Sequence, residues 1–141
     1  MEQEVVLSIQ GRQSYMGQEP ELIELVTEGV LTKTSDGWEI RYEESDLTGL
    51  EGVTTMFQIK PEQVVLTRTG KLNSQMIFQE GVSHDSLYQV DFGALMITVC
   101  AIQVKADLSE NGGTIDLVYS IEIEQNAAGR IDYHLNITPK K

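Results

Sequence analysis

The segment from residue 114 to residue 123 alternates apolar and polar side chains with a period of two. The apolar phase holds Ile115, Leu117, Tyr119, Ile121 and Ile123. A half-buried strand needs this pattern, because successive side chains point to opposite faces, whereas a helix would mix the two sets. Residues 131–137 repeat the pattern. Asn111-Gly112-Gly113 precedes the first segment and suits a tight reversal. This region therefore predicts antiparallel strands joined by short turns.

The same signals run through the rest of the chain. The three prolines lie at expected strand edges or turns, and no segment has a convincing helical period. Loops or turns are expected at 13–18, 45–52 and 126–129, and Gly29 indicates a bend or a bulge within its strand. Strands are expected at residues 5–11, 21–34, 38–43, 53–59, 64–69, 73–79, 87–92, 95–108, 114–123 and 131–137.

About ten strands with short connections predict an all-β fold in one domain spanning residues 1–141. A single antiparallel up-and-down barrel is favoured, because closure removes the free edges of a sheet. A two-sheet β-sandwich is the alternative. Barrels slightly wider than eight strands can hold a small ligand, so a cavity is expected inside.

The strand expected from residue 95 has apolar side chains on both of its faces. One row holds Met96, Thr98, Cys100, Ile102, Val104, Ala106 and Leu108, and the other holds Leu95, Ile97, Val99 and Ala101. Strands covered on both faces have this composition. We therefore expect another part of the chain, or a second copy in a homodimer, to cover the outer face at 95–101.

Charge and composition narrow the classes of function. The chain has 22 acidic and 10 basic residues and a net charge of -12. Nucleic acids and anionic membrane surfaces are therefore not expected partners. The single cysteine cannot form an internal disulfide, and the N-terminal residues lack the pattern of a secretory signal. These features predict an acidic, cytoplasmic protein.

Several short motifs occur in an order that resembles the YwiB-like family of small bacterial proteins. The motifs are Tyr42-Glu43-Glu44, Gly52 to Thr55, Arg68-Thr69-Gly70, Phe78 to Gly81, Tyr88 to Gly93 and Gly113 to Tyr119. The chain departs from the family pattern at Val90-Asp91, where members often have threonine and proline. The resemblance implies a calycin-like, that is lipocalin-like, β-barrel in a bacterial cytoplasm. It implies no activity, because the family has none established.

A set of residues is predicted to line the barrel interior and bind a ligand. Arg68 is a cation in an otherwise apolar and hydroxyl-bearing strand, so an inward side chain needs a carboxylate, and Glu44 is the expected partner. An inward Arg68 would either anchor an anionic ligand or only form an internal ion pair. The remaining alternative is that Arg68 faces solvent. The tyrosines either line a pocket or belong to the core. The full set is Tyr42, Glu44, Arg68, Phe78, Tyr88, Tyr119 and Tyr133.

No catalytic residue, metal site or cofactor is expected from the sequence. Cys100 has no histidine at a spacing that would activate it, and neither zinc-type spacing nor a phosphate-binding glycine loop occurs. The leading hypothesis is therefore a non-enzymatic barrel that binds a small apolar or anionic molecule. The alternative is a protein-protein interaction module that acts through its outer surface, with an enzyme ranked third.

Overall fold

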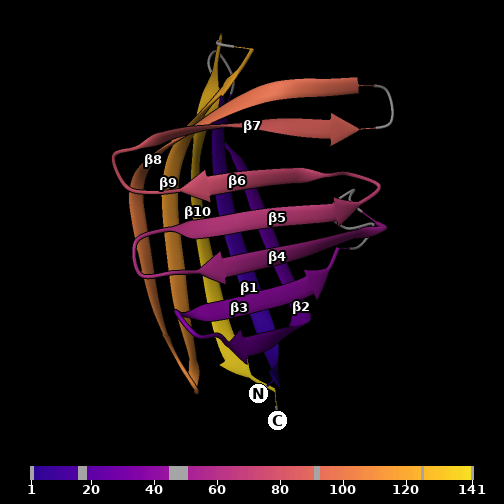
Figure 1. Cartoon of the computed structure of the whole chain (residues 1–141), viewed down its shortest axis with the longest axis vertical. Coiled ribbons are helices and arrows are strands. Elements are labelled where there is room, and N and C mark those ends of the chain that lie inside the picture. Colours follow the sequence, from indigo (N-terminus) through magenta and orange to yellow (C-terminus); the bar gives the residue numbers. More distant parts are fainter. Residues whose placement is uncertain (1, 16–18, 45–50, 91–92, 125, 141) are drawn as a thin grey trace.

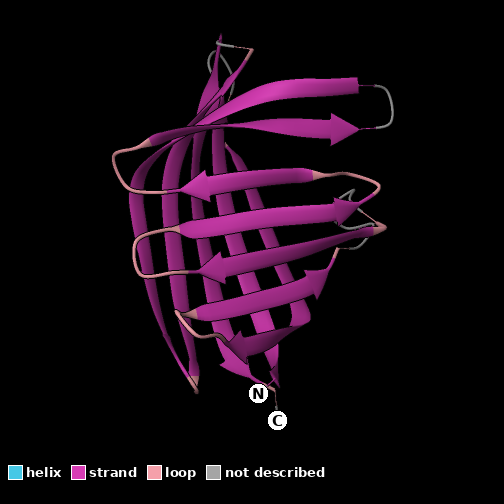
Figure 2. Cartoon of the chain, viewed as in Figure 1, coloured by secondary structure: helices cyan, strands magenta, loops and turns pink. Residues whose placement is uncertain are grey.

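The computed structural model describes residues 2–15, 19–44, 51–90, 93–124 and 126–140. These residues form ten strands and no helix (Figure 2). No helix within the described ranges is therefore long and apolar enough to cross a membrane. The strands are β1 (Glu2–Tyr15), β2 (Glu21–Lys33), β3 (Trp38–Glu43), β4 (Val53–Ile59), β5 (Val64–Gly70), β6 (Ser74–Phe78), β7 (Ser83–Val90), β8 (Gly93–Ser109), β9 (Gly112–Ile123) and β10 (Asn126–Pro139).

All ten strands belong to one antiparallel sheet in the order β6-β5-β4-β3-β2-β1-β10-β9-β8-β7. The two end strands, β6 and β7, meet through isolated bridges at Asn73↔Gln89 and Gln79↔Val82. The sheet is therefore a nearly closed barrel, which confirms the predicted all-β, ten-strand fold. The two-sheet sandwich is not adopted, because the hydrogen-bonded sheet runs without a break from β6 to β7.

The sheet folds into two crossing layers. In Figure 1 the strands β1, β2, β9 and β10 and the later part of β8 run lengthwise, and the shorter strands β3 to β7 cross in front of them, with the first part of β8 beside β7. One corner lies in β2, which pairs with β3 only from Val30 to Lys33. The register of β2 with β1 continues through Gly29, so no bulge exists there. A Cβ at Gly29 would lie 2.7 Å from the backbone oxygen of Arg41, so glycine permits this close approach of β3.

The second corner lies in β8, where the register with β9 shifts between Ala101 and Gln103. Before the shift, Ile97, Val99 and Ala101 are buried; after it, Val104 and Leu108 pack against the core. The bulge leaves Ile102 half exposed and moves the inward position from one row to the other. The two apolar rows therefore face the core in succession.

The predicted covering of the outer face at the start of β8 is not supplied by the described part of this chain. Met96 remains exposed there, as does its cross-strand partner Leu87 on β7. A second copy of the chain as the covering partner remains a prediction.

Two predicted turns were wrong where the structure describes them, at residues 13–15 and 126–129; residues 16–18 and 45–50 of the predicted loops lie outside the described residues. β1 continues through residues 13–15, since Gln13 pairs with Ile131 on one side and with Glu21 on the other. β10 begins at Asn126, which already pairs with Ile123, so residues 126–129 belong to the strand. Glu124 adopts φ +52 at the start of the reversal. In both places sheet pairing overrides the turn preference of polar residues and glycine.

The inward rows of both layers form one apolar core. Each fully buried aliphatic or aromatic side chain contributes roughly 1.5–3 kcal/mol to folding. The largest side chains that are almost completely buried are Phe57, Phe78, Leu7, Leu31, Ile40, Ile115, Leu117, Leu135 and Ile137. These side chains fill most of the interior, so polar groups facing inward are exceptions that need an explanation.

We expect Gly29→Ala to lower the free energy of unfolding by about 1–3 kcal/mol, because the new methyl group overlaps the backbone of β3. Gly11→Ala is the matched control, since its Cβ meets only Ile23 Cβ at 3.9 Å. The control should leave stability unchanged or raise it by up to about 1 kcal/mol. Urea unfolding measures both, and equal effects would contradict the proposed corner.

Candidate functional site

A row of polar residues crosses the inward face of the short-strand layer. Tyr42 on β3 pairs with Thr55 on β4, which pairs with Arg68 on β5, which pairs with Ser74 on β6. Their side chains point to one face because direct cross-strand partners share a face of the sheet. Each also lies in phase with the buried core residues of its strand. Glu44 directly follows β3 and contacts two members of this row, Thr55 and Arg68.

Glu44 is the centre of the polar row. Its side chain is only 2% exposed, and its Oε2 atom lies 3.9 Å from Arg68 Nε. The hydroxyl of Thr55 donates a hydrogen bond of 2.5 Å to the same oxygen. A buried carboxylate is tolerated only when such partners replace water. The predicted partnership of Glu44 with Arg68 is therefore present as an internal ion pair.

Two tyrosine hydroxyls extend this network. Tyr133 on β10 donates to the hydroxyl of Tyr42, which donates in turn to Glu44. Burial raises the pKa of Tyr42 from 10.0 to about 12, and the charge of Glu44 adds to the shift. Burial also raises the pKa of Tyr133 well above its ordinary value. Both phenols therefore stay neutral and act as hydrogen-bond donors at physiological pH.

Two buried polar atoms in the same row have no hydrogen-bond partner among the described residues. They are Arg68 Nε, which lies 3.9 Å from the ion-paired Glu44 carboxylate, and Ser74 Oγ. Buried polar atoms without partners are rare in folded proteins, because each costs about 1–3 kcal/mol. Arg68 and Ser74 are direct cross-strand neighbours, so the two unfilled positions lie side by side.

A pocket opens over these two residues where the barrel is least firmly closed. It has a volume of about 530 Å³ and is formed by residues of β5, β6, β7 and β8. We call it the seam pocket. Between the bridges at Asn73↔Gln89 and Gln79↔Val82, no ladder joins β6 to β7 in the described residues. The lining residues are Thr67, Arg68, Thr69, Asn73, Ser74, Gln75, Asp85, Ser86, Leu87, Gln89 and Met96.

The structure brings four of the seven predicted site residues together: Tyr42, Glu44, Arg68 and Tyr133. The other two described side chains, Phe78 and Tyr119, instead pack against each other, with ring centroids 4.6 Å apart.

The seventh predicted residue, Tyr88, pairs with Leu95 through its backbone, but its side chain lies outside the described part of the structure. Sequence reasoning missed Ser74. The sequence did contain a signal for its position. Ser74, Met76 and Phe78 are two residues apart, which places all three side chains on one face of β6.

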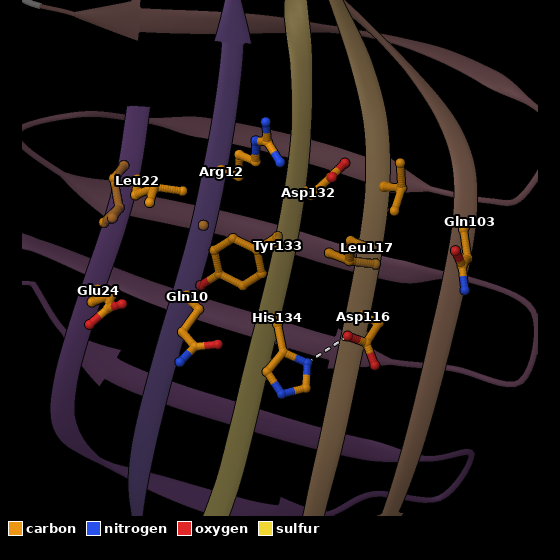
Figure 3. Close-up of a pocket in the computed structure, with 13 residues that line it drawn as sticks. Gln10, Arg12, Leu22, Glu24, Gln103, Asp116, Leu117, Asp132, Tyr133 and His134 are labelled. Carbon is orange, nitrogen blue, oxygen red and sulfur yellow. Dashed lines mark hydrogen bonds and ion pairs between the residues drawn. The ribbon is translucent and has the colours of Figure 1, made fainter. Parts of the chain in front are cut away.

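A second polar pocket lies on the outer face of the long-strand layer (Figure 3). There His134 Nδ1 on β10 lies within hydrogen-bond distance of Asp116 Oδ1 on β9, at 2.5 Å, and Arg12 on β1 and Glu24 on β2 also line the pocket. The side chains of His134 and Asp116 are 40% and 42% exposed. Solvated pairs of this kind contribute little to stability, and the polar outer phase of a half-buried sheet explains them. The seam pocket is therefore the stronger candidate.

No group of three or more metal-ligating side chains occurs in the ranges that the structure describes. The fold and the interior site define a small antiparallel β-barrel that buries a charged pair below a partly open seam. The chain belongs to the family DUF1934, a domain of unknown function, whose model matches residues 7–137.

Two comparisons with individual proteins agree with this membership. The chain is 28% identical over 82 residues to the uncharacterized beta-barrel protein YwiB of Bacillus subtilis (strain 168). The match spans 58% of this chain and only 56% of that relative's length. The crystal structure of the ywiB protein from Bacillus subtilis superimposes with a TM-score of 0.83 at 20% identity. It covers 99% of this chain and 94% of the other. At this identity the structural match establishes the fold alone.

The tyrosine network predicts a loss of stability at alkaline pH. Tyr42 keeps its proton in the folded state up to a pKa of about 12, whereas the unfolded chain releases it near 10.0. The unfolded state therefore binds fewer protons than the folded state between these values, and stability falls as pH rises. From pH 9 to pH 11 this group should lower the free energy of unfolding by about 1.4 kcal/mol.

Tyr42→Phe should remove this part of the alkaline loss, as measured by urea unfolding at the two pH values. Tyr133 continues to contribute in that variant, so the loss shrinks without vanishing. An unchanged difference between pH 9 and pH 11 would show that Tyr42 is not held neutral by its surroundings.

Proposed function

We propose that this protein is a non-enzymatic binding protein for a small molecule that joins an anionic group to an apolar part. The observation that carries the proposal is that two adjacent buried atoms, Arg68 Nε and Ser74 Oγ, have no hydrogen-bond partner in the described part of the chain and belong to residues that line the seam pocket. A carboxylate on the ligand accepts charge-assisted hydrogen bonds from a guanidinium and a further bond from a hydroxyl. Such a ligand would bond to the remaining N–H groups of the Arg68 guanidinium and to the neighbouring hydroxyl of Ser74.

The charge of Arg68 remains available to a ligand because Glu44 is already held by other donors. Thr55 and Tyr42 both donate to its carboxylate, and the ion pair places Glu44 at the Nε side of the guanidinium. A guanidinium has five N–H donors in a planar fork, so one ion pair does not exhaust it. The Arg68 side chain is 20% exposed and lines the seam pocket.

The apolar part of the ligand is assigned to the outer rim of the same pocket. Leu87 is 50% exposed and Met96 is 37% exposed, and the two are cross-strand partners. Covering them would remove apolar surface from water, at roughly 25 cal/mol per Å². The pocket volume of about 530 Å³ lies within the usual range of small-molecule sites.

A calycin-like relationship and a cytoplasmic location complete the proposal. The barrel fold supports the first, and the single free cysteine supports the second. Fold alone does not determine a ligand, so the proposal rests on the pocket rather than on the barrel.

Ser74→Ala separates binding from stability. Removing a buried hydroxyl without a partner should leave the free energy of unfolding of the ligand-free protein unchanged or raise it by about 1 kcal/mol. The same change should weaken binding of octanoate, measured by isothermal titration calorimetry. A stability loss with unchanged octanoate binding would assign Ser74 a purely structural role.

Arg68→Met should abolish octanoate binding and destabilise the fold by about 3–5 kcal/mol, because Glu44 is left buried without a cation. The double variant Glu44→Gln with Arg68→Met removes both charges and should recover much of the stability without recovering binding. Octanamide is the neutral control ligand and should bind at least about tenfold more weakly than octanoate to the natural protein. Equal binding of the two ligands, or binding that survives in the double variant, would contradict the anionic anchor.

The alternative function is an interaction module that acts through its outer surface, as a homodimer. It is favoured by the exposed apolar side chains Leu87 and Met96, which are cross-strand partners on the outer face. Native mass spectrometry of gently purified protein distinguishes the two functions, since a small extra mass lost on denaturation favours ligand binding and a bare dimer favours the module.

A further inference from the structure

The second half of β8 is a free sheet edge. β7 pairs with β8 only as far as Ser83↔Cys100, whereas β9 pairs with β8 on to Ser109↔Gly112. Within the described residues, no strand lies on the other side of residues 103–109. Open edges of this kind offer unpaired backbone donors and acceptors to any extended chain.

The direction of these backbone groups follows from one contact. The backbone N–H of Val104 donates to Glu80 Oε2 at 3.1 Å, so it points away from β9. In a strand the N–H and C=O groups alternate sides, so those of Ala106 and Leu108 point the same way. The Glu80 carboxylate therefore takes up the N–H of Val104 on this edge. The backbone groups of Ala106 and Leu108 on the same edge have no backbone partner among the described residues.

A trough runs beside this edge. It has a volume of about 740 Å³ and is bounded on the far side by Trp38 and by the turn at residues 60–63 between β4 and β5. Ala106 is exposed although Val104 and Leu108, in phase with it, pack against the core. The barrel is therefore open at this end, and a chain lying along the edge would not displace the core. We call this region the β8 edge trough.

The trough is strongly acidic. Five carboxylates line it against two lysines, which gives a local formal charge of -3. The residues concerned are Asp36, Glu62, Glu80, Asp107 and Asp116, with Lys60 and Lys105. A second copy of this chain, with a net charge of -12, would meet like charges at such an edge. A basic partner gains from the same field.

We propose that the β8 edge trough binds an extended peptide with alternating basic and apolar side chains, which adds to the sheet as a further strand beside β8. Main-chain hydrogen bonds to Ala106 and Leu108 supply affinity, as in other cases of strand addition. The apolar side chains of the peptide turn inward toward Trp38 and Leu108, and its basic side chains lie beside Asp107 and Glu62. This interaction is independent of the ligand proposed for the seam pocket.

The test uses the full chain and an acetylated, amidated six-residue peptide of alternating lysine and valine. Fluorescence anisotropy of a labelled form should show binding that weakens with added salt. The same peptide with N-methylated backbone amides keeps its charge and side chains but loses strand pairing, and it should bind at least about tenfold more weakly. A peptide of alternating glutamate and valine should not bind.

Ala106→Pro removes an outward N–H that β9 does not use, and proline is tolerated on edge strands. This variant should lose about tenfold in affinity for the peptide, whereas Ala106→Ser, which keeps the N–H, should bind as the natural protein does.

Hydrogen exchange provides a second measurement, in which the lysine-valine peptide should slow exchange of the amides of Ala106 and Leu108. Equal affinity of the N-methylated and unmodified peptides overturns the proposal, and this comparison holds even if the proline variant does not fold. A dimer in solution that buries these amides overturns it as well.

Discussion

The whole structure depends on bending one ten-strand sheet around its core. An antiparallel sheet of this width exposes two long edges unless it closes, and closure demands sharp corners. One corner is at Gly29, where β3 passes too close for any side chain. The other is the bulge between Ala101 and Gln103, which also turns a new row of β8 inward. These two corners determine how the layers cross, which residues of β8 face the core and which strand edges stay free.

The corners also determine where the barrel is imperfect. β3 leaves β2 at Gly29 and β7 leaves β8 near Cys100, so each long strand carries an unpaired stretch beyond its corner. The end strands β6 and β7 meet only through isolated bridges. The polar row ending at Ser74 reaches the surface at this seam, and the acidic trough follows the unpaired stretch of β8. Both proposed binding regions are thus consequences of how the sheet closes.

Much of the fold was predictable because alternation with a period of two is a local property. It located all ten strands and the inward phase of most of them. It failed where pairing between strands overrode the local turn preference, as at Gln13, held between β2 and β10, and at Asn126, paired with Ile123. The pairing of Arg68 with Glu44 was predictable because a buried cation needs a nearby carboxylate. Ser74 was missed because its even spacing with Met76 and Phe78 indicates only its face of the strand, and not that Arg68 lies beside it.

The sequence by itself determined the strand content, the apolar rows, the absence of an internal disulfide and the need to neutralise an inward arginine, because each depends on residue type and spacing. Only the tertiary structure decided that Tyr42, Thr55, Arg68 and Ser74 form one row, because register between strands is set by corners and core packing across the whole sheet. It alone also decided which backbone groups remain unpaired. A backbone group stays unpaired where two neighbouring strands separate, and the point of separation depends on residues far apart in the chain.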